Sequence, residues 1–255
     1  MGVIGPDAES LLQRLVSNDV TELTEGGACD ALLLTNKARV IAPLRIVRRR
    51  ADDFLLLTEP ELGDRVRREL VRFRLAAKAA IELEEHDSYV LLGSDSAPDG
   101  GLAVPARDYG VAAVEIVDAP APAGAEPVSD EELELLRIEA RTPRWGRELD
   151  DRVLPAEAGL VERAVSLTKG CFPGQEPIAR LHYRGHANRG LRVLELDGEE
   201  PPYDAEVKLG ERVVGRVTST ARAPDGCVRA LAYVRSEVPS DAELTVQGAA
   251  ARQLH

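Results

Sequence analysis

The chain has 255 residues, of which 44% are hydrophobic and 30% are charged, and its formal net charge is −12. This length and composition are typical of a soluble globular protein with one large domain or two to three small ones. No run approaches the roughly 20 apolar residues of a membrane-spanning helix, and the net charge excludes non-specific wrapping of nucleic acid but not a local basic patch.

The first half of the chain alternates strand and helix patterns. Residues 7–16 form one apolar stripe at helical spacing, so we predict a short helix there. A second helix is predicted from Pro60 to about Ala77, with arginines on its polar face. Strands are predicted at 31–35, 40–47, 54–58, 81–83, 89–92, 102–104 and 111–117. This alternation favours an α+β fold.

The second half begins with a Pro- and Ala-rich linker at 118–128. Ser129 with Glu132 three residues later forms a capping box, and the helix that follows is expected to face inward with Leu133, Leu136 and Ile138. The chain then reads as irregular up to Cys171, and residues 178–181 read as a helix or strand. Short alternating strands predict an antiparallel barrel after a boundary near residue 187: 191–196, 206–209, 213–217, 228–234 and 244–246.

The number and spacing of the cysteines disfavour a secreted, disulfide-bonded protein. There are three, they are far apart, and they form neither a disulfide framework nor a Cys-x-x-Cys pair. Cys29 and Cys227 border apolar strand patterns and are expected to be small buried residues. The N-terminus lacks a basic start and an apolar signal core, so we expect a cytoplasmic protein with no membrane partner.

The stretch Lys169-Gly170-Cys171-Phe172-Pro173-Gly174-Gln175-Glu176 is the strongest candidate site. Its glycines and proline place the thiol on a turn, and they let backbone amides approach a ligand. Lys169 can favour the thiolate by charge, and Gln175 and Glu176 add an amide and an acceptor. Cys171 could therefore act as a nucleophile, as a redox group or as an iron ligand.

Other candidates have a functional and a structural interpretation. Glu139 and Glu157 could each bind the N–H groups of a heterocycle or pair with a neighbouring arginine. His182 and His186 could hold a metal with Cys171 if they shared a helix face, but Gly185 disfavours a helix there. Arg48–Arg50 and the arginines of the second predicted helix could contact phosphates, although interleaved acids favour a solvated face.

The eight residues 169–176 closely resemble the signature of the YgfZ family, folate-binding proteins related to the glycine cleavage T-protein, an aminomethyltransferase. The resemblance extends to most of the chain. Segments that resemble other parts of the family are Asp7–Gln13, Ser17–Val20, Arg137–Ala140 with Pro143 and Gly146, Leu154–Ala158, Arg184–Gly190 and Gly215–Ser219.

The resemblance implies a three-lobed α+β fold of the T-protein type around a central opening where tetrahydrofolate, or a one-carbon derivative of it, binds. Residues 1–47 and 119–186 would form a discontinuous lobe that carries the Cys171 motif. Residues 48–118 would form the second lobe, and 187–255 the C-terminal antiparallel barrel.

The resemblance also assigns residues and partners. Glu139 would bond the pterin ring and Glu157 would line the same site. Cys171 would be the required thiol with Lys169 beside it, and no metal would be bound permanently. Further folate contacts are expected from Gln175, Glu176 and Arg180. The implied role is to support assembly or repair of iron–sulfur clusters in client proteins, one of which modifies tRNA.

Two alternatives stay open. One is an aminomethyltransferase or another folate-dependent one-carbon transferase. The related transferases carry an acidic pair where this chain has Ala42-Pro43, and neither residue can act as an acid or a base, which disfavours transfer. The other is an RNA-binding module that uses the basic segment from Arg39 to Arg74, which the net charge of the chain disfavours.

Overall fold

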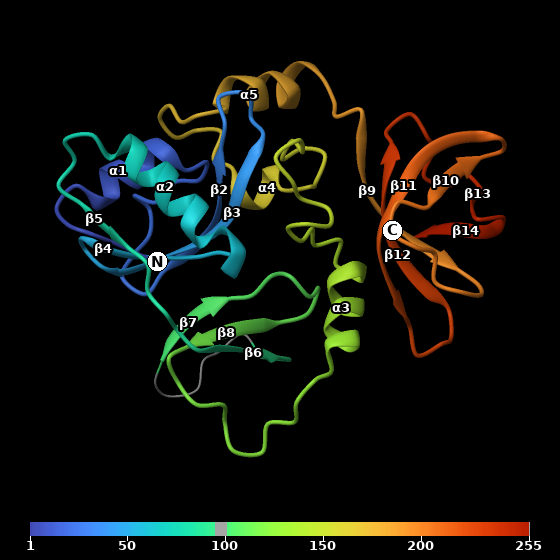
Figure 1. Cartoon of the computed structure of the whole chain (residues 1–255), viewed down its shortest axis with the longest axis horizontal. Helices are drawn as coiled ribbons and strands as arrows, with labels where there is room; N and C mark the ends of the chain where they lie inside the picture. The colour runs from blue at the N-terminus through green and yellow to red at the C-terminus, as the bar shows by residue number, and fades with distance from the viewer. Residues whose placement is uncertain (95–100, 255) are drawn as a thin grey trace.

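The computed structural model describes residues 1–94 and 101–254. In these residues two open sheets and a closed barrel lie around the helix α3 (Asp130–Glu139) (Figure 1). The first sheet and its helices lie on one side of the molecule and the barrel lies on the other, and the smaller sheet lies below the first sheet, beside α3. This is the expected three-lobed α+β arrangement.

The first sheet has five antiparallel strands in the order β2-β3-β4-β1-β5. The strands are β1 (Gly2–Ile4), β2 (Ala28–Leu34), β3 (Val40–Arg50), β4 (Asp53–Leu57) and β5 (Ala80–Glu82). The helices α1 (Ala8–Leu15) and α2 (Gly63–Arg74) cover one face, and a 3-10 turn, η1 (Pro60–Leu62), leads into α2. The sequence patterns predicted each of these elements except β1, which has only three residues and shows no periodicity.

Both faces of this sheet are buried, which explains why β2 ends in an unbroken apolar run. Leu33 packs under α1 and α2, whereas its neighbours Leu32 and Leu34 pack on the opposite face. That opposite face is covered by α4 (Val161–Ala164) and α5 (Gln175–Arg184), through Ala164, Ile178 and other side chains. The chain therefore returns to its first sheet after residue 160, as the expected discontinuous lobe requires.

The boundary expected between residues 47 and 48 falls inside β3. The same sheet continues through β4 and β1 to β5, so the chain remains in the first sheet up to Glu82. The reason is that β3 is central, bonded to β2 on one side and to β4 on the other. A strand pattern reports local periodicity, but it does not report which strands pair.

The second sheet has the order β6-β8-β7, with strands β6 (Ser88–Leu92), β7 (Leu102–Pro105) and β8 (Ala113–Val117). It packs on the first sheet, because Val104 and Val117 share an apolar cluster with Val47 and Leu55. The predicted linker follows β8 and leads to α3, which begins with the predicted capping box between Ser129 and Glu132.

The inward face of α3 differs from the expected one. Leu135 and Ile138 are buried with Arg137, whereas Leu133 and Leu136 are half-buried. The helix packs against β11 (Arg212–Arg222) and β12 (Val228–Arg235), and this contact selects the stripe of Leu135 and Ile138. The Arg137 side chain is buried as well, paired with Glu134 and Glu148, so the helix is not a simple amphipathic surface helix.

The C-terminal region is a closed antiparallel barrel with the order β10-β11-β12-β9-β14-β13. The remaining strands are β9 (Arg189–Leu196), β10 (Glu206–Leu209), β13 (Leu244–Val246) and β14 (Ala249–Leu254). The barrel confirms the predicted architecture. The pattern did not predict β14, whose three alanines have low strand propensity.

Within the described residues, no helix has both the length and the apolar character that crossing a bilayer requires.

Candidate functional site

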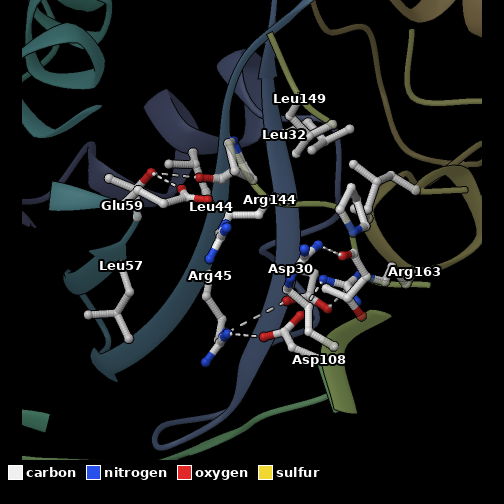
Figure 2. A pocket seen from close by; sticks show the side chains of 18 of the residues that line it. Asp30, Leu32, Leu44, Arg45, Leu57, Glu59, Asp108, Arg144, Leu149 and Arg163 are labelled. Atoms are coloured by element: carbon white, nitrogen blue, oxygen red, sulfur yellow. Dashed lines mark hydrogen bonds and ion pairs between the residues drawn. The ribbon is translucent and has the colours of Figure 1, made fainter. Parts of the chain in front are cut away.

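A cavity of about 340 Å³ lies where the first sheet, the second sheet and the segment after α3 meet (Figure 2). We call it the central cavity. Its walls come from β2 and β3, from the turn after β4, from β8 and the loop before it, and from residues around α4. Its size is within the range of about 300–1,000 Å³ typical of small-molecule sites.

The cavity exists because β3 is longer than its partner β4. The last residue pair between them is Arg45 with Leu57, so Pro43 and Leu44 have no β4 partner and border the open space. The Thr58 hydroxyl donates to the Pro43 carbonyl at 2.8 Å, which turns the chain away from β3 after β4 ends.

The two ends of the central cavity differ in polarity. Leu32 and Leu149 lie together at one end, whereas Asp30, Asp108 and Arg163 lie at the other (Figure 2). An apolar surface beside a few convergent polar groups is typical of a site for a flat, partly polar ligand.

The charged end is a network of two arginines and three carboxylates. Arg45 bonds Asp108 at 2.7 Å and also pairs with Glu115 and, at 3.8 Å, with Asp30. Arg163 bonds Asp108 at 2.8 Å, and its Nε lies 3.6 Å from Asp30. This Nε atom is buried and has no hydrogen-bond partner. Burial raises the pKa of Asp30 above its usual value.

Glu59 forms part of the opposite wall. Burial raises the pKa of its carboxyl group, and no cation among the described residues pairs with it. Four carboxylates and four arginines line the cavity, but Arg137 and Arg144 pair with Glu134, and Arg137 also with Glu148. Two arginines thus remain for four carboxylates, so the cavity offers an excess of hydrogen-bond acceptors to a ligand with N–H groups.

The Cys171 loop lines a separate, open groove of about 710 Å³. Cys171, Gln175, Glu176 and Arg180 all border it, so the structure brings four of the predicted site residues together, and the Cys171 side chain is exposed. None of these four is among the residues that line the central cavity. The thiol is therefore accessible from solvent through a groove on the outer side of α5.

Lys169 is turned away from this groove. Its ammonium group is buried and donates to the carbonyl oxygens of Val16 at 2.9 Å and Asn18 at 2.6 Å. Burial lowers its pKa to about 8, although Asp19 opposes this effect. These contacts attach the loop to the turn after α1. Activation of Cys171 by Lys169 stays a prediction.

Glu139 and Glu157 each pair with a different arginine of the barrel. The Glu139 side chain is 43% exposed and pairs with Arg229 of the barrel at 3.4 Å. Glu157 accepts hydrogen bonds from the Leu154 amide at 3.1 Å and from Arg189 at 3.2 Å. Neither carboxylate is among the residues that line the central cavity. Their predicted contacts with a pterin ring stay predictions.

The remaining candidates have structural partners. The helix α5 ends at Arg184, so His182 and His186 do not share a helix face. Arg48 pairs with Glu9, and Arg49 pairs with Asp53 and Glu84, which occupies two cations of the proposed RNA-binding segment. Burial raises the pKa of the Cys29 thiol to about 12, as expected for a packed cysteine.

The sequence analysis missed the residues that line the central cavity. The available signal was a charge inside an apolar strand pattern: Arg45 interrupts the run of β3, and Asp30 lies within β2. Glu59 and Asp108 gave no local signal, because they lie in loops where charged residues are common, and Arg163 lies in α4, whose four residues are too few to show a periodicity.

No family model matches the chain. Over its whole length the chain is 31% identical to the tRNA-modifying protein YgfZ of Edwardsiella ictaluri (strain 93-146), of which it covers 87%. It is 29% identical, over 95% of its length, to the aminomethyltransferase of Rubrobacter xylanophilus, of which it covers 75%.

Among solved structures, the chain resembles the glycine cleavage system aminomethyltransferase T from Bartonella henselae with a TM-score of 0.84. The match covers 100% of this chain and 81% of that one at 19% identity, and it confirms the T-protein-like fold. The full-length match at 31% identity to a YgfZ protein shows that the chain belongs to the YgfZ family.

Proposed function

We propose that the chain binds a reduced folate, tetrahydrofolate or a one-carbon derivative of it, with the pterin ring in the central cavity. The observation that supports this proposal is the excess of carboxylates around Asp30 and Glu59, beside an apolar wall. The 2-amino-4-oxo edge of a pterin has several N–H donors for such acceptors, and its ring faces suit the leucines.

The fit follows from the cost of buried charge. A buried carboxylate without a donor is unfavourable, and burial raises the pKa of both Asp30 and Glu59. Glu59 accepts from the Thr58 hydroxyl at 3.4 Å and from backbone amides. Asp30 lies 3.6 Å from Arg163 and 3.8 Å from Arg45, so neither carboxylate has a close cationic partner, and a ligand edge rich in N–H groups supplies further donors to both. Its carbonyl oxygen can accept from the unpartnered Nε of Arg163.

The first test is calorimetry with tetrahydrofolate. Glu59→Gln should weaken binding about tenfold or more, because a charge-assisted hydrogen bond is lost. Glu61→Gln is the matched control, since Glu61 is exposed and does not line the cavity, and it should leave the affinity unchanged. If the parent protein gives no heat and no thermal protection, the folate proposal is wrong.

The same measurement has an expected pH dependence. Ionisation removes the O–H donor and makes both oxygens charged acceptors for the N–H groups of the ligand, and burial raises the pKa of Glu59 and Asp30. The affinity should therefore fall as the pH is lowered, starting above the ordinary carboxyl value of about 4. In Glu59→Gln part of this fall should disappear.

Within this proposal the chain acts as an accessory protein rather than as an aminomethyltransferase. Pro43 borders the central cavity, and Ala42 packs in the core with α1, so the position that holds an acidic pair in the related transferases has no proton-carrying group. Release of methylenetetrahydrofolate from an aminomethyl donor by the purified protein would show instead that the chain is an aminomethyltransferase.

The accessory role that we propose is support of iron–sulfur cluster assembly or repair in client proteins, and through them of tRNA modification. The YgfZ relative is named a tRNA-modifying protein, and the iron–sulfur part rests on the motif at residues 169–176. Cys171 is exposed in a groove, which is what a redox, nucleophilic or transient ligand role toward a protein partner requires.

Cys171→Ser should abolish complementation of a strain that lacks the protein, while the thermal midpoint and the tetrahydrofolate affinity stay as in the parent. The reason is that the exposed thiol contributes little to packing and does not line the central cavity. Cys227→Ser, in the barrel, is the control and should complement fully. Full activity of Cys171→Ser would remove the thiol from the function.

A further inference from the structure

The groove that holds Cys171 continues along α5, and its wall carries two arginines. Arg180 and Arg184 both line it, and both residues are exposed. In the part of the chain that the structure describes, neither guanidinium group has a hydrogen-bond or ion-pair partner. In a chain with a net charge of −12, two unpaired guanidinium groups beside an accessible thiol indicate an anionic partner.

The spacing of these arginines is unfavourable for the helix itself. Residues four apart lie on the same face of a helix, and like charges at this spacing destabilise it. Arg184, in the last turn, gains from the helix dipole, but Arg180 lies one turn earlier and gains little from it. The positive face of α5 is therefore explained better by a ligand than by the stability of the helix.

The charge of the groove changes along its length. Glu176 lies in the first turn of α5, at the helix end that follows the Cys171 loop, and it is the only carboxylate among the described residues of the wall. Arg180 and Arg184 follow about 8 Å and about 14 Å along the helix axis from Gln175, at about 1.5 Å per residue. An anionic group therefore fits the far part of the groove and is repelled at the end near the thiol.

We propose that the groove binds an acidic segment of a client protein, with a cysteine of that segment opposite Cys171 and its carboxylates on Arg180 and Arg184. This inference rests on the accessory role proposed above and states what that role recognises. An extended chain advances about 3.3 Å per residue, so the acidic residues should stand about three and about five positions from the cysteine, when the turn between Cys171 and α5 is included. A nucleic acid carries negative charge at every phosphate and would meet Glu176, so a protein segment fits the groove better than RNA.

The test measures thiol–disulfide exchange between the full chain and short cysteine peptides activated as mixed disulfides with thionitrobenzoate. The Cys171 thiolate attacks the peptide sulfur, a disulfide forms between the two, and coloured thionitrobenzoate leaves with the electron pair of the broken bond. The rate of Cys171→Ser, which keeps Cys29 and Cys227, is subtracted.

Three peptides of one length are compared. The spaced peptide has aspartates three and five residues from its cysteine, the adjacent peptide has both aspartates next to the cysteine, and the neutral peptide has asparagines instead. Each is made with these residues before the cysteine and again after it, which covers both directions of the bound chain.

The spaced peptide should react about fivefold faster than the neutral one at low salt, and high salt should remove the difference. The adjacent peptide should gain less, because its aspartates would lie beside Glu176. Arg180→Gln with Arg184→Gln should bring the spaced peptide down to the rate of the neutral one, whereas the same pair changed to lysine should keep most of the preference. Arg67→Gln with Arg68→Gln, which removes two exposed charges from α2, should behave as the parent.

The proposal is wrong if Cys171 reacts with none of the peptides, if the spaced peptide has no advantage over the adjacent one, or if the glutamine double variant keeps that advantage. If added tRNA slows the neutral and the spaced peptide equally, the groove is an RNA site instead. The accessory role is tested separately by complementation with Cys171→Ser, so it stands if only the peptide preference fails.

Discussion

Replacement of Glu148 with alanine should lower the free energy of unfolding by about 3–5 kcal/mol, because it leaves a buried arginine partly uncompensated. The Glu148 side chain is fully buried. Its carboxylate accepts hydrogen bonds from Arg137 of α3 at 3.0 Å, from the Arg144 amide at 3.0 Å and from Ser219 of β11 at 2.7 Å. It therefore joins α3, the loop after it and the barrel.

Urea denaturation of parent and variant, with linear extrapolation, measures this difference. Glu134→Ala is the matched control, since Glu134 also pairs with Arg137 but its side chain is 21% exposed. Water can replace that contact, so we expect a loss of about 1 kcal/mol. A loss in Glu148→Ala no larger than that of the control would show that the buried carboxylate does not hold the lobes together.

Gly174→Ala should destabilise the Cys171 loop and abolish complementation. Gly174 has φ of +85°, and an added Cβ would lie 2.8 Å from the Thr35 carbonyl oxygen and 2.9 Å from the Ala38 Cα. Both contacts are with backbone of the β2–β3 hairpin rather than with a flexible side chain, so the hairpin or α5 would have to shift. We expect a stability loss of about 1–3 kcal/mol from the strained backbone, with a further loss from the displaced helix.

Gly170→Ala is a control within the same motif. At Gly170 an added Cβ meets nothing within 4 Å, and its φ is not in the left-handed region. This variant should keep nearly parental stability and activity, as measured by thermal unfolding and by complementation. Equal effects of the two substitutions would mean that the approach of α5 to the hairpin is not what positions the thiol.

Local sequence patterns were sufficient to predict most of the helices and strands. The capping box of α3 and the period-two strands of the barrel depend on neighbours within a few residues, so they were predictable. The groove beside Cys171 was predictable for the same reason, because Cys171, Gln175 and Glu176 belong to one short loop and helix start. Lys169 belongs to the same motif, but its side chain binds carbonyls after α1, a contact that no local pattern contains.

The central cavity depends on contacts between distant segments. Asp30, Asp108 and Arg163 come from three separate parts of the chain, and they meet only because β8 and α4 pack beside β2 and β3. The partner of Glu139 could not be predicted from nearby residues either, since the packing of α3 on the barrel brings its side chain to Arg229. Side-chain identity and local periodicity specify which elements form and where a motif lies. Which charges share a cavity depends on strand pairing and helix packing, because these bring together residues that have no contact along the chain.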